Sequence, residues 1–73
     1  MTFDELMDGA CKSARLPNMA RILLPSTLSD STKKAVMKLE PEAFGRILKD
    51  AIEQNDSGSV ESVDVLVRKA LKN

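Results

Sequence analysis

Few residues in this chain of 73 have side chains suited to acid–base, metal or phosphate chemistry. The sequence contains no histidine, one cysteine at position 11, and three glycines that are too far apart for a phosphate-binding loop. The lack of histidine removes the most common general base and metal ligand, and a single cysteine cannot form a zinc cluster. Glu40 and Glu42 are the best candidates for an acid–base pair of carboxylates, but acidic side chains also favour the first turn of a helix, where they stabilise its dipole. We therefore expect no catalytic residue, no metal, no cofactor and no small-molecule substrate.

Cys11 falls on the apolar stripe of the first predicted helix, so we expect a buried structural thiol with no histidine nearby to lower its pKa. A lone cysteine cannot form an internal disulfide, which favours a reducing compartment. The first residues are acidic where a signal peptide would be basic. Apolar runs such as residues 22–24 and 65–67 are far too short to cross a membrane. These features predict a soluble cytoplasmic protein that does not bind membranes.

The basic residues suggest one alternative, which is contact with nucleic acid. Lys33, Lys34 and Lys38 fall on a predicted helix over residues 30–38, and Arg21 precedes them. Cations grouped in this way can bind phosphates, and such binding weakens steeply with salt. However, eleven basic and eleven acidic side chains cancel over the whole chain, and lysines on a helix commonly do no more than face solvent. A DNA-binding regulator is therefore the less favoured interpretation.

Three apolar residues, Leu24, Met37 and Val65, fall off the apolar stripes of the predicted helices, which makes them candidates for a partner surface. A domain without catalytic groups acts by contact, and helical faces commonly dock other helices. Small helical units also complete their cores by dimerising, here through the C-terminal pair of helices. We therefore expect a non-catalytic interaction module, such as an adaptor, inhibitor or regulatory subunit, that binds another protein or a second copy of itself.

The clearest structural signals lie in residues 39–71, which predict two amphipathic helices joined by a polar turn. Pro41 suits the first helical position after an N-cap at Glu40, and Leu39 and Phe44 occupy the two positions of a hydrophobic staple. Apolar residues then recur at helical spacing until residues 55–58 end the helix, which we place at residues 41–54.

The last helix is predicted to begin after a cap at Ser59. Its inward stripe is a set of apolar residues at helical spacing: Val60, Val63, Leu66, Val67, Ala70 and Leu71. Val63, Val65 and Val67 also alternate as they would in a strand, but the sequence offers no second strand to pair with them. A helix is therefore the better interpretation.

In the first half, Thr2 and Glu5 form a capping-box pattern that opens an amphipathic helix ending before Pro17. A short helical turn capped by Asn18 follows, stopped by Pro25, with three apolar residues facing inward: Met19, Ile22 and Leu23. The helix over residues 30–38 directs three more inward: Ala35, Val36 and Leu39.

These elements predict an all-α fold, a compact orthogonal or irregular bundle of four short helices plus one extra helical turn, in a single domain over residues 1–73. No heptad pattern persists for two cycles, so a long coiled coil is not expected. Opposite charges at helical spacing further predict ion pairs on the solvent faces, among them Asp8 with Lys12, Asp64 with Arg68, and Glu42 with Arg46.

Overall fold

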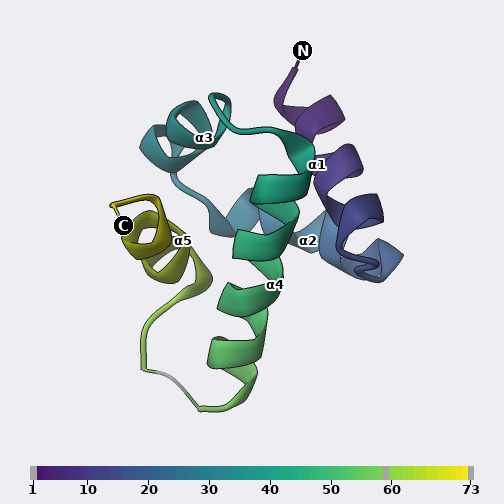
Figure 1. Ribbon diagram of the computed structural model, residues 1–73. Coiled ribbons are helices and arrows are strands. Elements are labelled where there is room, and N and C mark those ends of the chain that lie inside the picture. The colour runs from purple at the N-terminus through teal and green to yellow at the C-terminus, as the bar shows by residue number, and fades with distance from the viewer. Residues whose placement is uncertain (1, 59, 73) are drawn as a thin grey trace.

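A computed structural model describes residues 2–58 and 60–72, and this part of the chain forms five α-helices and no strand (Figure 1). In chain order the helices are α1 (Phe3–Ser13), α2 (Asn18–Thr27), α3 (Asp30–Val36), α4 (Pro41–Asp56) and α5 (Val63–Lys72). The predicted all-α irregular bundle is confirmed, and the predicted extra turn is a full helix, α2. No helix in residues 2–58 and 60–72 has the length and apolar character needed to cross a membrane.

Helix α4 stands at the centre of the bundle, with α1 on one side, α5 on the other and α2 behind it (Figure 1). The contact between α1 and α4 is the most extensive, and that between α4 and α5 comes next. The core they enclose is almost wholly aliphatic, with one phenylalanine at its centre. Its buried members are Leu6, Met7, Ala10, Cys11, Leu24, Leu28, Val36, Phe44, Leu48, Ala51, Leu66 and Val67.

The backbones of α1 and α4 meet at Gly45, which lies opposite Ala10. A Cβ atom built on Gly45 would stand 2.6 Å from the carbonyl oxygen of Ala10, closer than real Cβ contacts. Glycine is therefore the residue that lets the two helices pack at this distance. Beside this contact, the ring of Phe44, the residue before Gly45, lies with its centroid 6.4 Å from that of Phe3 at the start of α1, within the range of favourable tilted aromatic pairs.

Helix α1 begins and ends with well-formed caps. The Thr2 hydroxyl accepts a hydrogen bond from the Glu5 amide at 3.2 Å, as the capping box predicts. At the other end Arg15 has a left-handed φ of 57°, and the amide of Leu16 donates to the carbonyl of Cys11 at 2.9 Å. The left-handed residue and this bond form a Schellman motif, which ends α1 at Ser13, before Pro17.

Helix α4 follows its predicted signals closely. Pro41 occupies the first turn after the N-cap Glu40, and Phe44 is fully buried while Leu39 is half-buried against the core. The helix runs to Asp56, two residues beyond the predicted end, and Gly58 then adopts a φ of +94°. The predicted pairs Asp8–Lys12 and Asp64–Arg68 form at 3.1 and 3.9 Å, but Glu42–Arg46 is not among the ion pairs of the described residues.

Helix α5 begins later than predicted. Ser59, the expected cap, lies outside the described residues, and the helix starts at Val63, where the Ser62 hydroxyl accepts from the Val65 amide at 3.3 Å. Val60, expected to face inward, precedes the helix and is fully exposed. A serine next to the apolar run offers a cap that keeps Val63, Leu66 and Val67 on the inner face, so Val60 and Glu61 stay outside the helix.

Helix α3 also turns a different face inward than predicted. Val36 is buried as expected, but Ala35 is exposed and Thr32 is buried in its place. Thr32 and Val36 are four residues apart and so share one face of the helix. The hydroxyl of Thr32 is satisfied by that of Ser29 at 2.9 Å, which removes the cost of burying it. The Ser29 amide in turn donates to Asp64 Oδ1 at 2.9 Å and so links α3 to α5.

Candidate functional site

Helix α2 is apolar on both of its faces, and the inner face is not the one predicted. Leu24, expected on a partner surface, is only 6% exposed and belongs to the core, with Leu28 and half-buried Ala20 on the same face. Ala20 and Leu24 are four residues apart within the helix, which continues beyond Pro25 to Thr27, and Leu28 follows as its C-cap. The prediction that Pro25 stops the helix was wrong, and so was the expected position of Leu24.

The last turn of α2 contains Pro25 and two hydroxyl groups that bond to backbone carbonyls. Ser26 Oγ donates to the carbonyl of Leu23 at 2.8 Å, and Thr27 Oγ1 donates to that of Leu24 at 2.7 Å. Pro25 lacks the backbone donor that would bond to the carbonyl of Arg21, four residues earlier. The two hydroxyl bonds are to other carbonyls, and they stabilise the final turn, which ends at Thr27.

The opposite face of α2 carries Met19, Ile22 and Leu23, and we call these three residues the α2 outer face. Their exposed fractions are 61%, 65% and 53%. All three were predicted to face inward, and that prediction was wrong. Their spacing puts them on one side of the helix, away from the inner residues. A helix that is apolar on opposite faces is normally buried on both of them. A contiguous patch of exposed apolar residues is typical of a surface that binds a protein, a membrane or a ligand.

The edge of the α2 outer face next to α1 is polar and held in place by an ion pair. Arg21, the one charged residue of α2, contacts Asp8 Oδ1 at 2.6 Å, and Lys12 contacts the other oxygen of Asp8 at 3.1 Å. The hydrogen bond from Arg21, followed by that from Lys12, holds the pKa of Asp8 below its ordinary value. The three groups fix α2 alongside α1.

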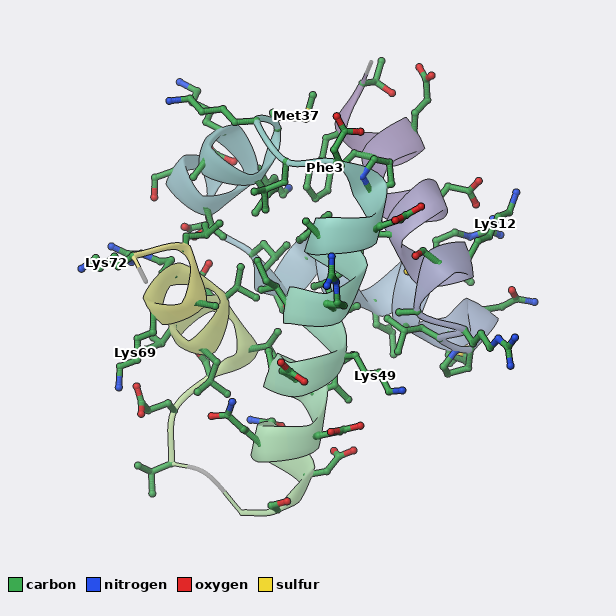
Figure 2. The ribbon with its side chains drawn as sticks, in the orientation of Figure 1. Phe3, Lys12, Met37, Lys49, Lys69 and Lys72 are labelled. Carbon is green, nitrogen blue, oxygen red and sulfur yellow. The ribbon has the colours of Figure 1, made fainter. Side chains whose placement is uncertain are left out.

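The charges on either side of this ion pair differ in sign. Towards the end of α2, Asp4 and Glu5 share with Pro25 the wall of an open groove of about 490 Å³. Towards its start, Lys12 lies beside Asn18 in a smaller hollow, and Figure 2 shows the Lys12 side chain extending into solvent. The edge of the α2 outer face is therefore acidic at one end and basic at the other.

The other two residues of the predicted partner surface do not join this face. Met37 caps the end of α3 and Val65 lies in the first turn of α5, with exposed fractions of 37% and 36%. Figure 2 places Met37 at the end of the molecule near Phe3. The structure thus distributes Leu24, Met37 and Val65 over the core and two separate elements.

The predicted nucleic-acid contacts are divided in a similar way. Arg21 is paired with Asp8, and the Lys33 amine lies 5.4 Å from the centroid of the Phe3 ring, a cation–π distance. Lys34 and Lys38 are exposed on and just after α3. Two of the four cations therefore already have an internal partner.

Cys11 and the C-terminal helices are parts of the core. The thiol is 4% exposed, its Sγ atom lies 3.8 Å from the sulfur of Met7, and burial raises its pKa, so the neutral form is favoured. The predicted buried thiol is confirmed. Leu48 and Ala51 of α4 and Leu66 of α5 are also buried, so the apolar stripes of the C-terminal pair are used within the bundle.

The α2 outer face is the feature that sequence reasoning missed. Two signals were present: α2 contains a single charge, and Ala20, Leu24 and Leu28 repeat every four residues across Pro25. Comparison of the chain with protein-family models, curated proteins and solved structures gives no match. The functional conclusion therefore depends on the geometry of the molecule.

Proposed function

We propose that this protein is a non-catalytic protein–protein interaction module, an adaptor, inhibitor or regulatory subunit, that docks its partner on the α2 outer face. The observation that supports this proposal is the exposure of Met19, Ile22 and Leu23 together on one side of a helix. Exposed apolar residues scattered singly are ordinary, but three that are contiguous on a helix match the anchor pattern of helix-in-groove recognition.

The energy available from this face is enough for a moderate interaction. Full burial of one such side chain contributes about 1.5–3 kcal/mol, and each of these three is more than half exposed. Covering all three would therefore contribute about 3–5 kcal/mol before the costs of association. The charged edge supplied by Asp8, Arg21 and Lys12 would add orientation more than affinity.

A pair of lysine substitutions tests the proposal, because the target residues are exposed and lie outside the core. Ile22→Lys places a charge in the middle of the α2 outer face, and Val60→Lys places the same charge on a fully exposed loop residue as a matched control. Both variants should melt like the wild type. We expect wild-type and Val60→Lys protein to retain the same partner, from a lysate of the source cells or as a second copy, and Ile22→Lys to lose it.

Equal retention by Ile22→Lys would contradict the proposed docking surface. A wild-type protein that is strictly monomeric and retains no partner would contradict the function itself.

Nucleic-acid binding has less support. Arg21 and Lys33 are engaged with Asp8 and Phe3, which leaves Lys34 and Lys38 from the predicted set. We expect no shift of the amide signals of α3 when duplex DNA is added at low salt, where phosphate contacts are strongest. Salt-sensitive shifts centred on Lys34 and Lys38 would favour the nucleic-acid interpretation instead.

A further inference from the structure

The charges beside the α2 outer face indicate which kind of partner could cover this face. Asp4 and Glu5 lie next to Pro25, near the last turn of α2, and form the acidic end of this edge. Lys12 lies next to Asn18, at the first turn of α2. Between these ends Asp8 and Arg21 neutralise one another. The edge thus has opposite signs at its two ends and no net charge in the middle.

A second exposed cation, Arg15, lies near the same end of α2. It is in the turn that leads from α1 into α2, three residues after Lys12. We call Lys12 and Arg15 the basic end, and Asp4 and Glu5 the acidic end. Each molecule therefore carries, next to one apolar face, both halves of a complementary charge pair.

We propose that the α2 outer face binds the same face of a second copy of this chain, with the two α2 helices antiparallel about a two-fold axis that crosses them. This inference rests on the proposed function and names the partner. In a two-fold contact the same patch is used on both molecules, so the patch must be complementary to itself. The antiparallel arrangement sets the acidic end of each copy opposite the basic end of the other.

A parallel arrangement does not use these charges. Turning the second copy about an axis along α2 would place the two α1 helices on opposite sides, and the charged edges would not meet. The antiparallel arrangement places both α1 helices on the same side of the helix pair. Charge complementarity of this kind fixes the orientation of an interface more than its affinity.

The size of the patch determines the strength of this dimer. The ten residues of α2 span about 15 Å, and three apolar side chains with their charged edge cover less than the roughly 800 Å² per partner of a standard interface. The dimer therefore belongs to the weak, concentration-dependent class. Its population should rise with protein concentration and fall as added salt screens the charged edge.

Sedimentation equilibrium of the full chain, from about 10 μM to about 1 mM, measures this association directly. Ile22→Lys should abolish it, whereas Val60→Lys should leave it unchanged. Asp4→Lys and Arg15→Glu should each weaken it about tenfold, because the contact occurs twice in the dimer and each reversal turns attraction into repulsion.

Mixing the two charge-reversed variants is the decisive experiment. In a heterodimer of Asp4→Lys with Arg15→Glu, one contact is the reversed pair and the other is the original pair, so both are attractive. We expect the equimolar mixture to associate about as tightly as the wild type, although each variant alone associates weakly. Circular dichroism melts of each variant confirm that folding is retained, and the neutral variants Asp4→Asn and Arg15→Gln serve if a reversal unfolds the chain.

Other outcomes overturn the inference. A wild-type protein that stays monomeric at about 1 mM excludes the dimer. If it also captures a different protein that Ile22→Lys does not, the proposed function stands and only the identity of the partner is wrong. Association that survives Ile22→Lys, or a mixture no tighter than its components, excludes this geometry.

Discussion

Replacing Gly45 with alanine adds one methyl group where α1 and α4 are closest. The new Cβ atom would lie 2.6 Å from the carbonyl oxygen of Ala10, and because this oxygen belongs to the helix backbone it cannot rotate aside. The two helices must then move apart by several tenths of an ångström. That movement loosens the packing of the most extensive helix–helix contact in the bundle.

Two opposing effects determine the size of the change in stability. Alanine favours the helix by about 1 kcal/mol over glycine, while overpacking a tight core costs about 1–3 kcal/mol. The clash is with backbone, so we place the cost near the upper value and expect a net loss of about 2 kcal/mol. For a chain of this length that corresponds to a fall in Tm of about 8–16 °C.

Thermal and urea unfolding followed by circular dichroism measure this loss. Gly9→Ala is the matched control, because it brings the same helical preference at a site where the new Cβ would meet Pro41 Cβ at 3.0 Å, a longer approach than the 2.6 Å at Gly45. We expect Gly45→Ala to be clearly less stable than Gly9→Ala. If Gly45→Ala is as stable as the wild type, α1 and α4 do not approach each other as closely as described.

Three further changes test other parts of the fold. Phe44→Ala should cost about 3–5 kcal/mol, because the ring is fully buried; a melt close to that of the wild type would contradict its central place in the core. Arg15→Gly should stabilise the protein by about 1 kcal/mol in urea unfolding, since Arg15 holds a left-handed φ of 57° that glycine adopts without strain. Asp64 accepts a hydrogen bond from the Ser29 amide, which lowers its pKa, so its carboxylate stabilises the fold above about pH 4 and loses this effect as the pH falls through its lowered pKa. The stability difference between wild type and Asp64→Asn should therefore be constant near neutral pH and shrink in acid; a difference independent of pH would refute this role.

The parts of the fold that were predicted correctly depend on signals close together in sequence. Pro41 after Glu40, and Gly58 after a polar run, set the ends of α4 because proline and glycine restrict the backbone of their own neighbourhood. The capping of α1 by Thr2 is equally local. Such features need no knowledge of the rest of the chain.

The predictions that failed depended on what lies across the bundle. A proline such as Pro25 normally stops a helix, but here α2 continues to Thr27, and both Leu24 and its C-cap Leu28 are buried in the core. Because Leu24 and Leu28 face the core, Met19, Ile22 and Leu23 face solvent. Helix propensity and local spacing could not decide between two apolar faces of the same helix, because only the packing of α2 against its neighbours does so.

The pairing of α1 with α4 also affects how the chain reaches its folded state. These two helices share the largest contact, yet α2, α3 and their connections lie between them along the chain. Folding must therefore close a long loop before the main contact can form. The chain loses the entropy of the open loop before the contact contributes its favourable free energy. We expect this bundle to fold more slowly than an up-and-down helical bundle of the same length, with a transition state in which α1 already lies against α4.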